Sequence, residues 1–231
     1  MTSSEFWRSV RATRPLLEEL KLLQPPMQLH RKLSEEFRNV SLRVDAPYAD
    51  VFRTGLEQRD YCFLLEDYSF FQLFYAEGGQ GRFAIRCAFY PNPFPFVSLE
   101  DFLEDLGLSG SDPEAMEFYH QHLSEQSGVD GFGPFRYEVD FDAHRPLRHA
   151  CAHLHVGHHT PTRIPLDKVL SPKAFVLFMT KCNFPDAWCA SDGTAGVPNA
   201  FDQTLETEKG SCATLEDEYF EDAERGEPFL T

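Results

Sequence analysis

Three segments in the first half of the chain alternate apolar and polar positions with a period of two. They span residues 61–65, 68–75 and 82–90, and a glycine-rich turn at residues 78–81 joins the last two. Such alternation is typical of β-strands with one buried face, and short glycine-containing connections favour hairpins. The sequence therefore predicts an antiparallel meander. The segment YPNPFPF, residues 90–96, ends it because proline donates no ladder hydrogen bond.

Two later segments, residues 135–141 and 150–156, alternate in the same way. If they pair, their apolar faces match, and helices would cover that face. The opposite face would then bring His153 and His155 near Asp140. The predicted polar face carries Arg136, Glu138 and Asp140 from the first segment and Cys151, His153 and His155 from the second.

Helical periodicity precedes and follows these strands. Ser4 is expected to cap a first helical turn, and Thr13 with Pro15 just inside is expected to begin a second helix, which ends at Pro25. The leucines of this second helix form an apolar stripe that indicates a core-facing side. Three further helices are expected to start at Ser98, Ser111 and Ser171.

These elements predict an α+β fold: an antiparallel sheet of about five strands with helices mainly on one face and a helical N-terminus. Residues 1–199 are expected to form a single domain, with a helical part at 1–58 and the sheet and its helices at 59–184. Residues 200–231 are expected to form an acidic C-terminal tail.

The composition narrows the class of protein. The 231 residues are 42% hydrophobic, which is enough for a real core, and no apolar run approaches the roughly 20 residues that span a bilayer. The N-terminus lacks the hydrophobic stretch of a signal peptide. The six cysteines form no CxxC pair, so we expect reduced, mostly buried thiols in a cytoplasmic protein without membrane contact.

The net charge of −16 argues against broad, sequence-independent binding of nucleic acid, which draws its affinity from many Lys and Arg contacts to phosphate. Binding of a small anion and binding of a basic protein partner both remain compatible with this charge. Ten carboxylates lie in residues 202–231, a pattern typical of a solvated tail. The alternative is docking on a basic groove of a partner through the apolar residues of this end, which are Leu215, Tyr219, Phe220, Phe229 and Leu230.

Histidines are concentrated in one segment, where six of the nine in the chain lie within residues 144–159. Residues 143–166 contain no Asp or Glu, although the chain as a whole is strongly acidic. Arg145 and Arg148 lie among the histidines, so this segment would present a local positive field that attracts an anion.

The predicted site combines three kinds of side chain. His153, His155 and Asp140 are the candidate catalytic residues. Two interpretations stay open for the histidines: they act as general acid and base on an anionic substrate, or they bind a divalent metal. The third metal ligand would be Asp140, His158 or Cys151. The candidate anion-binding residues are Arg86, Arg148, Arg145 and Tyr90.

Each interpretation competes with a simpler one, in which the histidines pack in a half-buried sheet without chemistry. The sequence contains no P-loop, GxGxxG, GxSxG or HExxH string. Cys151 beside His153 also suggests a nucleophile, but a small buried thiol is the commoner role for such a residue.

The order of several segments resembles the uncharacterised bacterial family DUF2290. These segments are RDYCFLLEDYSFFQLFY, RFAIRCAFYPNPF, FRYEVDFDAHRP, AHLHVGHHTPTRIPL and LSPKAFVLFM, and the YPNP and HLHxG strings are the most specific among them. The resemblance covers residues 59–184 and implies one continuous α+β domain. It implies no activity, and the acidic end beyond Asn199 lies outside it.

Two functions from different classes follow. The first is an enzyme that acts on a phosphorylated or nucleotide-like anionic substrate through the His/Arg-lined sheet face, with a divalent metal as the possible cofactor. The alternative is a non-catalytic acidic interaction protein, the partner of a basic nucleic-acid enzyme in bacterial defence or in a toxin-antitoxin pair.

Overall fold

The computed structural model describes residues 1–24, 32–79, 82–107, 113–126, 133–190 and 197–225. Its centre is a seven-stranded antiparallel sheet in which each strand pairs with its neighbours in sequence. The strands are β1 (Leu23–Gln24), β2 (Phe63–Leu65), β3 (Phe70–Glu77), β4 (Phe83–Tyr90), β5 (Phe135–Asp140), β6 (Ala152–Val156) and β7 (Arg163–Pro165).

The α+β class is confirmed, as are the five predicted strands, here β2 to β6. The sheet is larger than predicted because β1 and β7 extend it at both edges. With two and three residues, these strands are too short to display an alternating pattern. Pairing with a longer neighbour defines them: Leu23 lies opposite Leu65, and Ile164 lies opposite Leu154.

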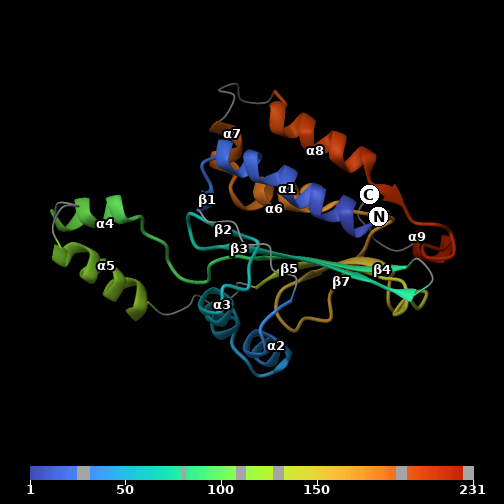
Figure 1. Cartoon of the computed structure of the whole chain (residues 1–231), viewed down its shortest axis with the longest axis horizontal. Helices are drawn as coiled ribbons and strands as arrows, with labels where there is room; N and C mark the ends of the chain where they lie inside the picture. Colours follow the sequence, from blue (N-terminus) through green and yellow to red (C-terminus); the bar gives the residue numbers. More distant parts are fainter. Residues whose placement is uncertain (25–31, 80–81, 108–112, 127–132, 191–196, 226–231) are drawn as a thin grey trace.

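One face of the sheet is covered by helices from both halves of the chain (Figure 1). They are α1 (Ser3–Glu19), α6 (Pro172–Asn183), α7 (Pro185–Ala190) and α8 (Ala200–Ser211). Their apolar side chains pack on the sheet residues Ile85, Cys87, Phe89, Tyr137 and Val139. Burial of these residues holds the sheet face and the helical layer together.

Helix α1 differs from the prediction of two short helices. It is one continuous helix, capped by Thr2 rather than Ser4, with Pro15 inside it. Proline removes a helical hydrogen bond, but the apolar stripe of Phe6, Val10 and Leu17 continues past it and is fully buried. Burial of that stripe offsets the cost of the proline.

The opposite face is partly covered by α2 (Glu35–Leu42) and α3 (Tyr48–Glu57), which pack on a second cluster that includes Phe70 and Tyr90. Helices α4 (Leu99–Leu106) and α5 (Pro113–Glu125) project away from the sheet (Figure 1). The predicted Ser98 cap is confirmed, and Gly107 ends α4 in the left-handed conformation. None of the described helices is long and apolar enough to cross a membrane.

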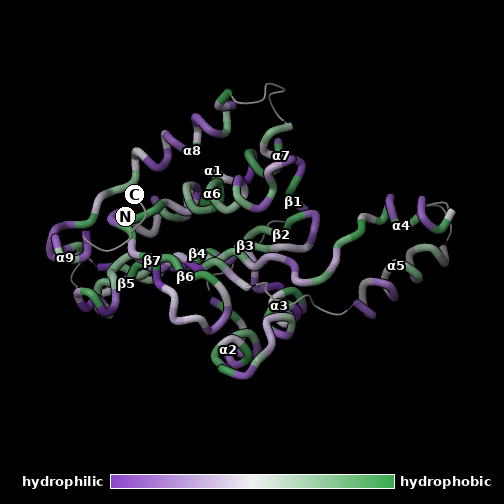
Figure 2. The backbone as a smooth tube through the Cα atoms, turned by 180° about the vertical axis from the view of Figure 1, so that it is seen from behind, coloured by the Kyte–Doolittle hydropathy of each residue, from purple (hydrophilic) through white to green (hydrophobic). Residues whose placement is uncertain are grey.

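The C-terminal segment packs on the helical layer, which differs from the expectation of a solvated tail. It forms α8, β9 (Ala213–Thr214) and α9 (Asp222–Arg225), and β9 pairs with β8 (Lys168–Val169). Figure 2 shows α8 alongside α1 and α6. Two of the predicted partner-docking residues, Leu215 and Phe220, are buried in the main core, and Tyr219 packs on Phe141. Phe229 and Leu230 lie outside the described residues.

Cys151 also differs from the predicted face. Strand β6 begins at Ala152, so Cys151 precedes the strand and does not follow its alternation of side chains. The Cys151 side chain lies in the core. Burial raises the pKa of this thiol to about 12. A protonated, enclosed thiol is a structural residue rather than a nucleophile.

Thiol labelling tests this distribution of cysteines. We expect a disulfide reagent at pH 8 to modify Cys182 and Cys189, which are exposed, within minutes in the native protein. The other four thiols are buried and should react only after addition of denaturant. Rapid native labelling of Cys151, identified by peptide mass spectrometry, would contradict its place in the core.

Candidate functional site

Beside the cluster under α2 and α3 the same sheet face is polar, and strand register aligns its side chains in two rows. One row crosses five strands through Gln72, Ala88, Arg136, His155 and Arg163. The adjacent row runs through Phe74, Arg86, Glu138, His153 and Pro165. The predicted gathering of arginine, histidine and carboxylate side chains on one sheet face is therefore present.

His153 and His155 lie side by side on β6, and both are buried. Their Nε2 atoms are 2.9 Å apart. His153 Nδ1 lies 2.8 Å from the carbonyl oxygen of Ala150, an acceptor, which assigns the Nδ1 proton to His153 and leaves its Nε2 as a lone pair. His155 Nε2 then donates to that lone pair, and His155 Nδ1, which is buried, has no partner.

Burial lowers the pKa of both imidazoles, and that of His155 falls to about 4 as His153 and Arg136 add charge repulsion. Both rings are therefore neutral at neutral pH. Neutral imidazole is the form that accepts a proton or a metal ion.

Glu138 is the carboxylate beside the histidine pair. Its Oε1 lies 3.0 Å from Arg86 Nε, and its Oε2 lies 4.0 Å from His155 Nε2. The prediction of Asp140 for this position is not what the structure shows. Asp140 Oδ1 instead accepts hydrogen bonds from the backbone N–H groups of Asp142 and Ala143, in the turn that leaves β5.

One ligand atom from each of Glu138, His153 and His155 can be chosen so that all three lie within 4.8 Å of one another. Ligands in a tetrahedral site with bonds of about 2 Å are roughly 3.3 Å apart. The Nε2–Nε2 distance of 2.9 Å and the Nε2–Oε2 distance of 4.0 Å lie on either side of that value. The three atoms are therefore close enough to be candidate ligands of one divalent cation.

Arg136 lies between the histidines and the aromatic core. Its Nε is buried and has no hydrogen-bond partner, and its charge acts on the pKa of both Tyr90 and His155. Gln72 Nε2, in the same row, is also buried without a partner. A buried donor without an acceptor costs free energy, so these two donors make the polar face a candidate place for a ligand with acceptor atoms.

The predicted anion-binding residues separate into two groups. Arg86 and Tyr90 lie on the polar face, but Tyr90 is buried against Phe70, and burial raises its pKa to about 12. Arg145 and Arg148 lie in the exposed connection between β5 and β6, where Arg145 forms a backbone bridge to His149. The described contacts do not bring these two arginines to the histidine pair.

His158 and His159 lie in the connection between β6 and β7, which reaches α2 and α3. His159 Nε2 lies 2.6 Å from the carbonyl oxygen of Arg43, and the ring of His158 is 6.3 Å from that of Tyr48. This connection therefore forms one wall of the polar face, and neither residue is grouped with His153 and His155 as a metal ligand.

The family model described as "Uncharacterized conserved protein (DUF2290)" matches residues 27–225. The chain belongs to the DUF2290 family. The match extends beyond the expected 59–184 at both ends and includes α8, β9 and α9. No curated protein and no solved structure matches the chain. The function of this DUF2290 protein therefore has to be inferred from its own residues.

A cavity of about 510 Å³ opens beside the polar face, between α2 and strands β3 and β4. Gln72 and Arg86 line it, so it is continuous with both rows of the face. Gln72 was not among the predicted site residues, although a single amide within the apolar run FFQLF is a usable signal. The remaining lining residues include Lys32, Leu33, Arg38, Leu42, Asp60, Tyr61 and Phe74.

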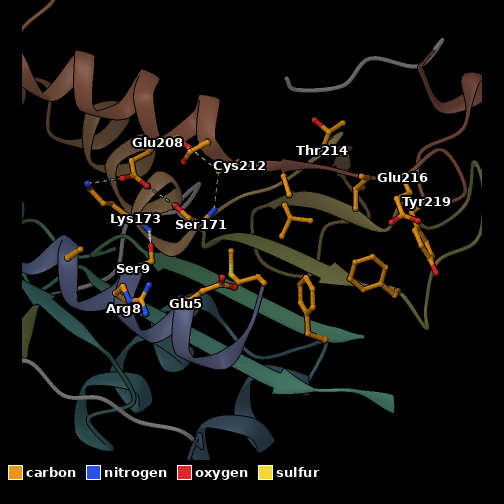
Figure 3. A pocket seen from close by; sticks show the side chains of 18 residues that line it. Glu5, Arg8, Ser9, Ser171, Lys173, Glu208, Cys212, Thr214, Glu216 and Tyr219 are labelled. Carbon is orange, nitrogen blue, oxygen red and sulfur yellow. Dashed lines mark hydrogen bonds and ion pairs between the residues drawn. The ribbon is translucent and has the colours of Figure 1, made fainter. Parts of the chain in front are cut away.

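A second cavity, of about 680 Å³, lies on the other side of the molecule between α1, α8 and β9 (Figure 3). Its central polar groups bind one another. Lys173 Nζ is 2.8 Å from a Glu208 carboxylate oxygen, and Ser171 Oγ donates to the same carboxylate. Paired groups of this kind join α6 to α8, so this cavity is a weaker candidate than the polar face.

Proposed function

We propose that this protein is a metal-dependent enzyme that acts on a phosphorylated or similarly anionic substrate at the polar sheet face. The observation that carries the proposal is the convergence of ligand atoms from Glu138, His153 and His155 within 4.8 Å. Two imidazoles and one carboxylate are a common ligand set for catalytic zinc and for non-haem iron.

The groups around these three residues support the proposal. The Ala150 carbonyl fixes the tautomer of His153, as second ligand shells usually do. Arg86 holds one oxygen of Glu138, so the other is turned toward His155. For His155 Nε2 to hold a metal ion, the proton on this atom would move to the unpartnered Nδ1.

Three protein ligands leave coordination positions open for water and substrate. A bound divalent ion lowers the pKa of a water ligand and neutralises a phosphoryl oxygen. Hydrolysis of a phosphate ester there would join the oxygen of a water molecule to phosphorus, break the bond from phosphorus to the ester oxygen, and deliver a proton of that water to the leaving oxygen. Arg136, next to His155 in the row, stabilises the negative charge on the phosphoryl oxygens.

Elemental analysis of the purified full chain tests the metal site. We expect the wild type to contain about one equivalent of Zn, Mn, Fe or Ni. The variants Glu138→Gln and His153→Ala/His155→Ala should lose this metal because they lack its ligands. Asp140→Asn is the matched control. It removes a carboxylate from the same strand face as Glu138, but this carboxylate binds the backbone of the turn after β5, so the variant should retain the metal.

Activity is measured with p-nitrophenyl phosphate and with nucleoside monophosphates, on the metal-loaded and the chelator-treated protein. Hydrolysis that requires the metal and disappears in Glu138→Gln supports the proposal. Metal-free protein that cannot be reloaded with any of the four metals would refute the site. Retained metal without hydrolysis would make the ion structural and refute the enzyme.

A further inference from the structure

The cavity between α2, β3 and β4 is cationic within a strongly acidic protein. Lys32, Arg38 and Arg86 line it, against a single carboxylate, Asp60. That carboxylate is occupied, because it accepts hydrogen bonds from the backbone N–H and the hydroxyl of Ser34. Arg86 is paired with Glu138 through Nε, whereas Lys32 and Arg38 have no free carboxylate among the described lining residues, an arrangement that suits a phosphate group.

Gln72 adds a directional donor to this cavity. Its side chain is 8% exposed, it lines the cavity, and its Nε2 has no hydrogen-bond partner. The amide of a buried glutamine is worth its desolvation cost only when a partner accepts its N–H. A bound molecule with an acceptor atom would supply this partner.

An aromatic face lies next to this donor. Phe74 follows Gln72 by two residues on β3, so both side chains are on the same side of the sheet, and both line the cavity. Phe74 is half-buried and lies opposite Arg86 in the register. The lining therefore offers, in order along the sheet, an amide, a ring face and a guanidinium group.

We propose that this cavity binds a nucleoside monophosphate, with the base stacked on Phe74, an acceptor atom of the base bound to the Gln72 amide, and the phosphate bound by Arg86 and Arg38. Arg86 also contacts Glu138, so this phosphate lies next to the three candidate metal ligands. The inference rests on the proposed function because it names the substrate of the same site. The net charge of −16 favours a single nucleotide over a nucleic-acid strand.

Calorimetric titration of the full chain tests this assignment. Adenosine, guanosine, cytidine and uridine 5′-monophosphates serve as probes. Adenosine has the base without the phosphate, and ribose 5-phosphate has the phosphate without the base. We expect the preferred mononucleotide to bind at least about ten-fold more tightly than either half. A 5′-phosphorylated oligonucleotide that binds more tightly than every mononucleotide would overturn the assignment.

Two variants separate recognition from folding. Gln72→Leu and Arg38→Ala should each weaken mononucleotide binding about ten-fold, because each loses one polar contact to the ligand. Gln72→Leu also removes an unpartnered buried donor, so we expect its melting temperature to equal or exceed that of the wild type. Arg11→Ala, an exposed change on α1 across the sheet, is the matched control and should bind normally.

The two proposals fail in different ways. A protein that retains its metal but shows equal affinity for mononucleotide, nucleoside and ribose 5-phosphate overturns the nucleotide assignment alone. A Glu138→Gln variant that has lost its metal yet still binds the mononucleotide retains the nucleotide site. Unchanged mononucleotide affinity in both Gln72→Leu and Arg38→Ala would overturn the place of the ligand in this cavity.

Discussion

Truncation after Asn199 is expected to unfold the protein. The removed segment contributes Phe201, Leu205, Leu215 and Phe220 to the core, and each is at most 6% exposed. Loss of a single buried Leu or Phe side chain costs about 2–5 kcal/mol. Four such losses, about 8–20 kcal/mol, approach or exceed the whole stability of a typical domain, about 5–15 kcal/mol.

Circular dichroism and thermal melting measure this effect. The truncated chain should lack a cooperative transition near that of the full chain. The matched control keeps the segment but neutralises three exposed acids, Glu216→Gln, Asp217→Asn and Glu218→Gln, and should melt within a few degrees of the wild type. A truncated chain that melts normally would show that the segment only adds charge.

Tyr137→Phe should be the most damaging removal of a single oxygen. Tyr137 is fully buried on β5, where its hydroxyl donates to the Lys168 carbonyl at 3.0 Å and accepts from the Leu170 N–H at 2.8 Å. The substitution leaves both backbone groups without a partner, at about 1–3 kcal/mol each. We expect the free energy of unfolding to fall by about 2–6 kcal/mol.

Urea unfolding of Tyr137→Phe and of a control, Tyr75→Phe, tests this value. Tyr75 also donates to a backbone carbonyl, that of Met1, but it is half-buried, so water replaces the lost bond and the change should be small. Because Tyr137 points away from the polar face, its variant should still bind metal. Equal urea midpoints for the two variants would mean that β8 is held without this hydroxyl.

The strands and the polar face were predictable because one buried face imposes a strict alternation. The choice between Glu138 and Asp140 was not. The two carboxylates are two residues apart and share a face, so only the register with β6 decides which one meets the histidines. That register depends on a turn closed by the Asp140 side chain and by the Arg145–His149 bridge, and alternation carries no information about either.

The C-terminal segment was misjudged for a different reason. Its charge density suggested solvent, but four apolar residues spaced irregularly through it bury against α6 and the sheet. Charged residues on one side of a helix say little about its other side. The cavity could not be predicted from the sequence either, because Gln72 and Arg38 come together only when α2 packs beside β3.

Helix α1 and its partner α6 lie far apart in the sequence. The two helices are joined by a hydrogen bond from the Lys173 N–H to Ser9 Oγ, across 164 residues. At a synthesis rate of about 5–20 residues per second, α6 follows α1 by roughly 8–33 seconds, whereas β3, whose Tyr75 packs on Phe6, is made earlier. The neighbouring hairpins of the meander need only local contacts and can form during this time. Docking of α6 on α1 thus follows formation of the hairpins when the chain folds during synthesis.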